Sequence, residues 1–232
     1  VHKADFQKEF GLQIAPNTPI LAIVSRLTGQ KGIDLLVKQA QRILDELKVQ
    51  IVIQGTGDRN SKDKDKLTDI EVALKTLAER NPGRVVFINI YDEAIAHRIY
   101  SSSDIFLAPS KYEPGGITPL IAMLFGTIPV VRDIGGLHDS IIDPDHEPGK
   151  SNGFKFYAFD DHEFYLAVAR AVNRYRIAPQ DFKRMQRRAT NSVVTWKKRV
   201  PEYVNVYRQA LQKVRRAEAR LLPVRRPRAG GR

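Results

Sequence analysis

The segment Pro109–Asp139, PSKYEPGGITPLIAMLFGTIPVVRDIGGLHD, decides the fold of this chain. Its middle predicts a short apolar helix near Thr118–Phe125, and a strand follows at Ile128–Val131. The strand is almost wholly apolar, as expected for a strand that is covered on both faces of a sheet. Glu113 and a Gly-Gly pair stand immediately before the helix. The segment therefore predicts a buried strand and a polar, glycine-containing loop that leads into a helix.

The same alternation of short apolar runs and amphipathic segments extends over most of the chain. Further strands are expected at Ile20–Val24, Val49–Gln54, Val85–Ile88 and Ile105–Ala108. Further helices are expected near Ile33–Leu47, Lys66–Arg80 and Glu93–Ser102, the last with Asp92 as its N-cap. This order of elements predicts an α/β fold, a Rossmann-like doubly wound parallel sheet with right-handed crossovers.

The pattern changes after Asp139, where a polar loop over 143–153 leads into a helical extension. Helices are expected near Asp161–Tyr175, Pro179–Ala189 and Val200–Leu221. The last carries Tyr203, Val206, Tyr207 and Leu211 at helical spacing, a stripe that predicts core packing. We expect a linker segment over 1–18, one domain with C-terminal helices over 19–221, and a basic disordered tail over 222–232. Residues 59–69 are expected to form an exposed, charged loop.

Composition and charge narrow the class of protein. The 232 residues are 42% hydrophobic and 28% charged, include no cysteine, and carry a net charge of +12. No apolar run reaches the ~18 residues that a membrane helix needs, so no membrane partner is expected. From Lys183 onward, 16 Lys or Arg residues stand against Glu202 and Glu218, which gives this stretch +14 and leaves −2 for the first 182 residues. The basicity is thus a C-terminal property. A solvated tail is the expected interpretation, and a polyanion-binding tail is the alternative.

Three glycine-containing loops follow predicted strands and are expected to meet at one edge of the sheet. They are Ser25–Gly32 (SRLTGQKG), Gly55–Asp58 (GTGD) and Glu113–Thr118 (EPGGIT). In open parallel sheets, ligands bind beyond the carboxyl ends of the strands. The convergence of three such loops therefore predicts a ligand site there.

The residues of these loops suit a ligand with a phosphate and a reacting carbon. The free N–H groups at the start of the helix can bind phosphate, close to the Cβ-free Gly115 and Gly116 and the hydroxyl of Thr118. Arg26 and Lys31 can stabilise negative charge on a leaving diphosphate, although loop cations can also be merely solvated. Such a ligand is a nucleotide sugar.

Glu113 has two interpretations that the sequence does not separate. Its carboxylate can accept a structural hydrogen bond at the helix start, or it can lie against a sugar and stabilise positive charge at the anomeric carbon.

Other apparent motifs fail. Gly149-Lys150-Ser151 ends like a P-loop, but Pro144 stands where the first glycine is required. The five histidines lack zinc-ligand spacing, so no metal site is expected. No cofactor besides the nucleotide-sugar donor is expected, and no specific nucleic-acid partner is expected either.

With these residues assembled, the chain resembles the bacterial glycogen synthase and plant starch synthase family of retaining GT-B glycosyltransferases. It is similar to their C-terminal, donor-binding half, over about Lys3–Tyr207. The strongest blocks are SRLTGQKG at Ser25–Gly32, PSKYEPGGIT at Pro109–Thr118 and GTIPVVRDIGGL at Gly126–Leu137. The resemblance implies that 19–221 is a nucleotide-sugar-binding domain and that the missing partner is an N-terminal GT-B domain.

The resemblance also implies roles for single residues. Arg26 and Lys31 match the pair that grips the donor diphosphate, and Glu113 matches the glutamate beside the transferred glucose; these three are the expected catalytic residues. Five residues are expected to bind the donor, with Tyr91 stacking on the base: Tyr91, Gly115, Gly116, Ile117 and Thr118.

The implied reaction transfers glucose from ADP-glucose to the non-reducing end of an α-1,4-glucan with retention. The implied location is the bacterial cytoplasm, or the plastid stroma if the source is a plant. A GT-B enzyme with another donor such as UDP-glucose or another acceptor, and a non-catalytic polyanion-binding module, are the alternatives.

The sequence departs from the family pattern at three places. Gly115 and Pro119 stand where the family usually has Cys and Gln, and proline is tolerated in the first turn of a helix. Ile121 occupies the position at which many wider GT-B enzymes carry a second glutamate, which fits the synthases better than other transferases. The family's N-terminal Lys-x-Gly-Gly loop is not in this sequence, so a chain of this extent is expected to be inactive alone.

Overall fold

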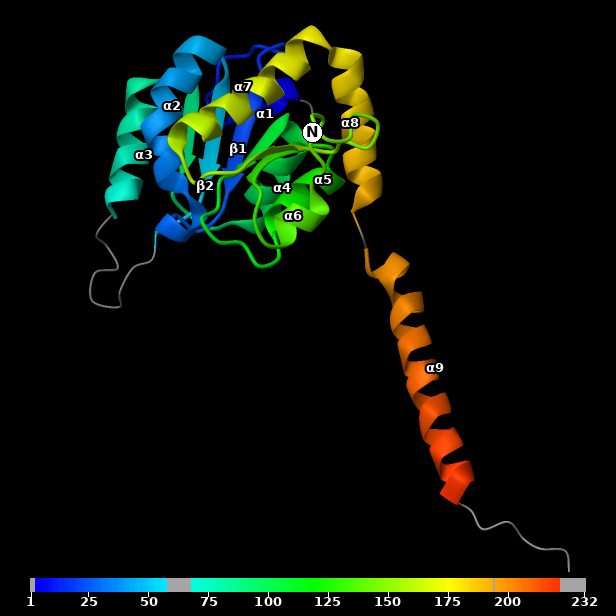
Figure 1. Cartoon of the computed structure of the whole chain (residues 1–232). Coiled ribbons are helices and arrows are strands. Elements are labelled where there is room, and N and C mark those ends of the chain that lie inside the picture. Colours follow the sequence, from blue (N-terminus) through cyan, green and yellow to red (C-terminus); the bar gives the residue numbers. More distant parts are fainter. Residues whose placement is uncertain (1–2, 58–67, 194, 222–232) are drawn as a thin grey trace, which may run out of the picture. The chain divides into compact units, whose positions relative to one another are not determined.

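The computed structural model describes residues 3–57, 68–193 and 195–221. At its centre lies a parallel sheet of six strands in the order β3-β2-β1-β4-β5-β6 (Figure 1). The strands are β1 Ile20–Val24, β2 Gln50–Gln54, β3 Val85–Ile88, β4 Ile105–Ala108, β5 Ile128–Arg132 and β6 Phe154–Phe156. Five of the six were predicted to within one residue. The missed strand β6 has only three residues with a lysine in the middle, too short to show a periodicity.

The central strands are buried on both faces, which explains their unbroken apolar sequences. Every residue of β1, β2 and β4 is buried. In the parallel register, Leu21 of β1 pairs with Ile51 of β2 on one side and with Ile105 of β4 on the other. Burial of such side chains contributes roughly 1.5–3 kcal/mol each.

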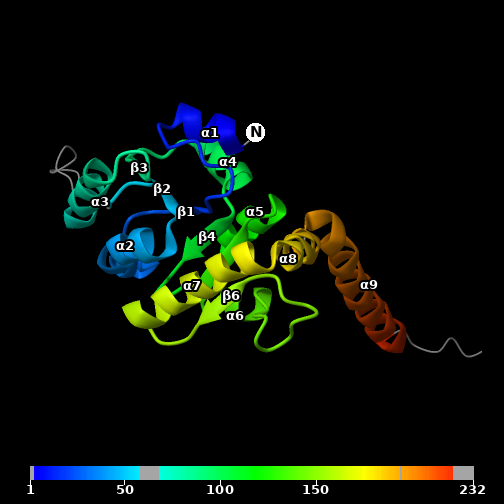
Figure 2. The same ribbon diagram turned by 90° about the horizontal axis from the view of Figure 1, so that it is seen from above.

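Helices cover both faces of this sheet, as the prediction of a doubly wound fold requires. Seen from above in Figure 2, α2, α3 and α7 lie on one side of the strands, and α1, α4 and α5 lie on the other. The helices are α1 Lys3–Glu9, α2 Ile33–Leu47, α3 Asp69–Arg80, α4 Glu93–Ser102, α5 Ile117–Leu124, α6 Gly136–Ser140, α7 Asp161–Ile177, α8 Pro179–Ser192 and α9 Trp196–Leu221. The bounds of α2 and α4 match the predictions, and the predicted N-cap of α4 is confirmed, since the Asp92 carboxylate accepts a hydrogen bond from the Ile95 amide at 2.8 Å.

The segment expected to be a linker contributes to the core. Within α1, Phe6 is fully buried, and Gln7 donates a buried hydrogen bond to Gln50 at 2.7 Å. Lys3 pairs with Asp104 at 2.6 Å. Periodicity over seven residues is too short a signal to reveal such a helix, so the sequence alone placed this part outside the domain.

The chain divides into two compact units, 1–193 and 194–232, instead of continuing as one domain to 221. The second unit contains α9. The stripe of Tyr203, Val206, Tyr207 and Leu211 is more than half exposed, so the expected core packing is not found within the described part of this unit. The expected tail, 222–232, and most of the expected loop at 59–69 lie outside the described residues.

No helix among the described residues is both long and apolar enough to cross a bilayer.

Candidate functional site

A cavity of about 460 Å³ opens at the carboxyl ends of the strands, where the three glycine-containing loops were expected to meet. Its floor comes from the ends of β1 and β2, and its walls come from α4 and from the start of α5. The lining residues are Val24, Ser25, Arg26, Lys31, Gly55, Thr56, Tyr91, Glu93, Ala96, His97, Tyr100, Ile117, Thr118 and Ile121. The parallel sheet thus gathers segments that are far apart in sequence.

An ion pair between Lys31 and Glu113 joins two of these loops. The Lys31 Nζ lies 2.6 Å from the Glu113 Oε2, and the side chains are 20% and 10% exposed. The same oxygen accepts a hydrogen bond from the Ser110 hydroxyl at 3.0 Å, and Oε1 accepts one from the Gly116 amide at 3.2 Å. Both carboxylate oxygens are therefore engaged, and the side chain is fixed.

The pKa of Glu113 results from two opposing effects. Burial raises it, but the hydrogen bond and the positive charge of Lys31, together with Ser110 and Gly116, lower it below the ordinary value of 4.5. The net direction is downward, so Glu113 is ionised at neutral pH. The site therefore holds a carboxylate that is negatively charged at neutral pH.

Two glycines make this geometry possible. At Gly32 the backbone is left-handed (φ +68°), and an added Cβ would lie 1.9 Å from the carbonyl oxygen of Pro109. At Gly135, with φ +54°, it would lie 2.1 Å from the carbonyl oxygen of Glu113. The loops after β1 and β5 can therefore touch the loop after β4 only because these positions have no side chain.

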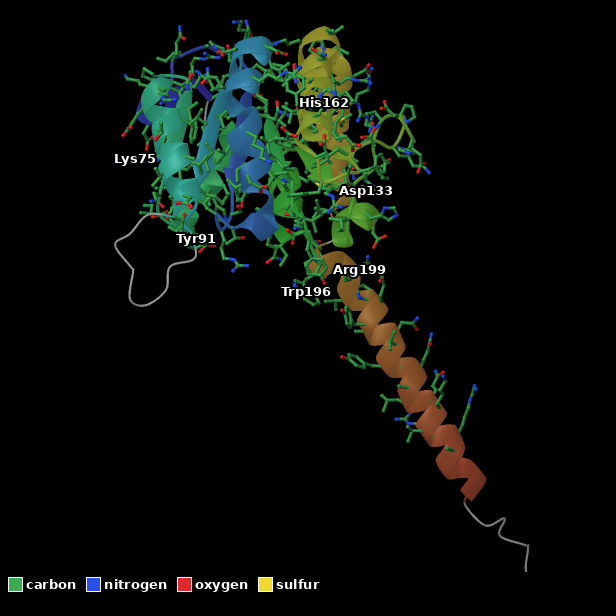
Figure 3. All side chains as sticks on the ribbon, turned by 60° about the vertical axis from the view of Figure 1, so that its left-hand side comes forward. Lys75, Tyr91, Asp133, His162, Trp196 and Arg199 are labelled. Atoms are coloured by element: carbon green, nitrogen blue, oxygen red, sulfur yellow. The ribbon has the colours of Figure 1, made fainter. Side chains whose placement is uncertain are left out.

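The structure brings most of the predicted site residues to the cavity, though not all of them. Arg26, Lys31, Ile117 and Thr118 line it, and Tyr91 lies at its rim as a residue that is 75% exposed. Figure 3 shows Tyr91 at the lower end of the sheet unit.

The glutamate and the Gly-Gly pair do not line this cavity. Glu113 lies behind Lys31 beside a much smaller recess that it shares with Thr118. Gly115 borders open space, whereas an added Cβ at Gly116 would lie 2.4 Å from Leu137. Gly116 therefore makes room for protein packing and not only for a ligand.

Sequence reasoning missed the wall that α4 contributes. Ala96 and His97 follow Glu93 by three and four residues, and Tyr100 follows them by four and three, so these four residues lie on one helical face and line the cavity together. That spacing was visible in the sequence, but nothing in it told which face of α4 borders a ligand. Burial, together with the nearby Tyr91, raises the pKa of Tyr100, so its phenol stays protonated.

Chemically, the site combines two cationic side chains, a carboxylate held by hydrogen bonds and an exposed aromatic ring. Arg26 and Lys31 suit a diphosphate, since charged donors bind phosphate oxygens strongly. Among the described residues, no group of three or more His, Asp or Glu side chains is arranged to hold a metal ion.

Comparison with known proteins places this arrangement in a family. The model of the family "Glycosyl transferases group 1" matches residues 5–191. The chain belongs to this family. This group 1 glycosyl transferase chain is 38% identical over 208 residues to glycogen synthase of Clostridium botulinum (strain Alaska E43 / Type E3). The aligned region covers 90% of this chain and 41% of the relative. It is 36% identical over 209 residues to glycogen synthase of Bacillus subtilis (strain 168), with the same coverage.

Solved structures agree with these relatives. The catalytic domain of starch synthase IV from Arabidopsis thaliana, bound to ADP and acarbose, superposes with a TM-score of 0.79 at 30% identity, over 90% of this chain and 42% of that one. The predicted family resemblance and the predicted GT-B type of fold are confirmed. This group 1 glycosyl transferase chain spans about two fifths of the length of the curated relatives it matches.

Proposed function

We propose that this chain is the donor-binding part of a glucan synthase that transfers glucose from ADP-glucose to the non-reducing end of an α-1,4-glucan, with retention at the anomeric carbon. The observation that carries the proposal is the cavity itself, where Arg26, Lys31 and Thr118 converge beside the Lys31–Glu113 pair. The glycogen synthase relatives and the starch synthase bound to ADP and acarbose support the donor and the acceptor.

In the proposed reaction, the bond between the anomeric carbon and the diphosphate oxygen breaks and ADP leaves. A hydroxyl oxygen of the acceptor forms the new bond to that carbon, and its proton passes to the departing diphosphate. Negative charge grows on the departing diphosphate, and Arg26 and Lys31 stabilise it. Lys31 has three N–H donors, so it can bind a phosphate oxygen while it keeps its contact with Glu113.

Glu113 acts in this proposal as a fixed negative charge beside the sugar. Positive charge develops at the anomeric carbon, and a carboxylate that is ionised at neutral pH stabilises it. A covalent bond to Glu113 is not required, and both of its oxygens already accept hydrogen bonds. Gly115, Gly116, Ile117 and Thr118 are proposed to contact the donor phosphate and sugar, and Tyr91 is proposed to stack on the base.

The remaining contacts are proposed to come from an N-terminal domain of the same enzyme, since the chain spans about two fifths of its relatives. The chain alone is then expected to bind nucleotide weakly and to turn over negligibly, because much of the transition-state binding is missing. The proposed location is the cytoplasm of a bacterium, or the plastid stroma of a plant.

Calorimetric titration of the chain with ADP, AMP and UDP tests the donor site. ADP should bind more tightly than AMP, because only ADP presents a second phosphate to Arg26 and Lys31. Arg26→Ala should reduce that difference, and Arg187→Ala, an exposed change on α8, should not. Equal affinities for ADP and AMP in the parent would contradict the proposed diphosphate site. Tighter binding of UDP than of ADP would contradict the proposal that the base of the donor is adenine.

The transfer itself can be tested in a fusion. The N-terminal part of the Bacillus subtilis relative, placed before this chain, should allow labelled glucose from ADP-glucose to enter glycogen. Glu113→Ala in the fusion should abolish that incorporation. Incorporation that survives this change would remove Glu113 from the reaction.

A further inference from the structure

The charges that line the cavity are separated across the sheet. Arg26 and Lys31 follow β1, whereas Glu93 follows β3, which is two strands further along the sheet order. Glu93 is the first residue of α4, the helix that forms a separate wall of the cavity, so its charge and the two cations are presented by different elements of the site. Among the described residues that line the cavity, Glu93 is the one carboxylate. A diphosphate at the cationic side therefore leaves the nucleoside facing Glu93.

The backbone that carries Glu93 is held firmly. Gln54, fully buried at the end of β2, donates a hydrogen bond from Nε2 to the carbonyl oxygen of Asp92 at 2.8 Å. The Asp92 side chain caps α4 through the Ile95 amide. Glu93 therefore begins a fixed helix, and its exposed carboxylate is presented from a rigid element.

Tyr91 and Glu93 lie on the same side of the chain. Asp92 between them has an extended backbone, with φ −140° and ψ 121°. In extended backbone, residues two apart point to the same side, and both Tyr91 and Glu93 border the cavity. A base that stacks on the Tyr91 ring then turns its edge toward a carboxylate.

We propose that Glu93 determines the base preference of the donor site by accepting a hydrogen bond from the exocyclic amine of adenine. An ionised carboxylate can only accept hydrogen bonds. It therefore favours a base that presents an amine at this edge and repels one that presents a carbonyl oxygen, as uracil and hypoxanthine do. The inference rests on the proposed nucleotide-sugar function and adds a residue that determines donor specificity.

Inosine diphosphate is the sharpest probe, because it differs from ADP by a carbonyl oxygen in place of the amine at the base edge and an N–H beside it. Titration of the full 232-residue chain, followed by nuclear magnetic resonance, should give a Kd for ADP roughly fivefold below that for inosine diphosphate. The modest ratio reflects the exposure of Glu93. In Glu93→Ala the ratio should fall to about one, chiefly because ADP binds more weakly.

Two matched variants separate this effect from general charge. Glu93→Gln keeps the size and removes the charge; its amide can also donate to a carbonyl oxygen, so the ratio should again fall to about one. Glu79→Gln makes the same charge change on the exposed side of α3 and should leave the ratio unchanged. Thermal unfolding of each variant checks that the exposed substitution leaves the fold intact.

Each result decides the matter. A ratio that survives in Glu93→Ala overturns the proposal. The proposal is also overturned if Glu93→Ala no longer distinguishes ADP from 2′-deoxy-ADP but still prefers ADP over inosine diphosphate. The carboxylate would then bind the ribose and not the base. Equal binding of ADP and inosine diphosphate by the parent chain overturns this inference alone. Failure of the parent to bind any of the three nucleotides removes the proposed donor site as well.

Discussion

Two ion pairs at opposite ends of the sheet are almost identical in geometry. Lys31–Glu113 lies at the carboxyl end of the strands and Lys3–Asp104 near the amino end, each with its charged atoms 2.6 Å apart. The side chains of Lys3 and Asp104 are 18% and 16% exposed, close to the values for the other pair. Asp104 also borders a cavity of about 450 Å³. Neither the distance, nor the burial, nor the adjacent cavity separates a structural pair from one proposed to act on a ligand.

The surroundings do separate them. The Asp104 carboxylate accepts the Ile20 amide at 2.8 Å and so anchors the start of β1, and burial raises the pKa of Asp104 despite the charge of Lys3. Around Glu113 the hydrogen bonds outweigh burial and its pKa is lowered. Of the two pairs, only Lys31–Glu113 is surrounded by loops that leave neighbouring strands, with Arg26 and the start of α5 beside it. Function is thus inferred from the convergence of loops, not from the pair.

The largest expected effect comes from Gly135→Ala, which disturbs the loop that carries Glu113 and leaves the Lys3–Asp104 pair untouched. The new Cβ would lie 2.1 Å from the Glu113 carbonyl oxygen at a positive φ, so the free energy of unfolding should fall by about 3 kcal/mol. Nucleotide affinity should fall with it, since the loop after β4 must move. Urea unfolding and ADP titration measure both. Gly149→Ala, where an added Cβ meets open space, is the control, and an equally stable Gly135→Ala would show that the loops do not depend on this contact.

Lys3→Ala should cost stability but not affinity. It leaves the carboxylate of Asp104 without its ammonium partner, so the free energy of unfolding should fall by about 2 kcal/mol. The Kd for ADP should stay within experimental error, because α1 and Asp104 are not among the residues that line the proposed donor cavity. Lys8→Ala on the exposed side of the same helix is the matched control. A loss of ADP affinity in Lys3→Ala would mean that the two ends of the sheet are coupled.

Lys31→Ala should have the opposite profile. Removing a charged donor from a phosphate contact should weaken ADP binding about tenfold, which corresponds to about 1.4 kcal/mol. The free energy of unfolding should change less, because Ser110 and Gly116 continue to satisfy Glu113. Lys75→Ala on the outer side of α3 (Figure 3) is the control. Unchanged ADP affinity in Lys31→Ala would place this lysine with Lys3 as a structural residue.

The smallest effect is a difference in pH dependence. The pKa of Glu113 is lowered on folding, so its contribution to stability is present above the unfolded value and is lost as the pH falls through the folded one. The pKa of Asp104 is raised, so its contribution has the opposite sign and declines as the pH rises above the unfolded value of 3.8. Urea unfolding between pH 3 and pH 7 should therefore show opposite pH trends for Glu113→Gln and Asp104→Asn, each relative to the parent. Parallel trends would contradict the assigned directions.

Long periodic segments were predictable, while short ones and their partners were not. α2 and α4 were predicted to the residue because their apolar faces repeat over two or more turns. β6, with three residues, and α1, with seven, carry too little pattern to be recognised. The apolar stripe of α9 was recognised, but a stripe does not tell what covers it, and its side chains are exposed.

The candidate site follows the same rule. The loops after β1, β2 and β4 could be assigned to one edge because parallel strands place their carboxyl ends together. The α4 wall, with Glu93 and His97, was not predicted because the rotation of a helix about its axis depends on its packing. Gly115 lies beside open space, whereas Gly116 packs on Leu137. Two adjacent glycines in a sequence do not predict this difference in their surroundings.

By itself, the sequence determined the parallel α/β architecture and the three loops that bear the glycines, cations and glutamate, since local periodicity and turn chemistry encode these. Only the tertiary structure decided that Lys31 meets Glu113, 82 residues away, at 2.6 Å, and that Tyr91 and Glu93 face the same cavity as Arg26. Such contacts depend on how twisted strands and packed helices orient side chains across long separations in sequence, and no local pattern records that orientation.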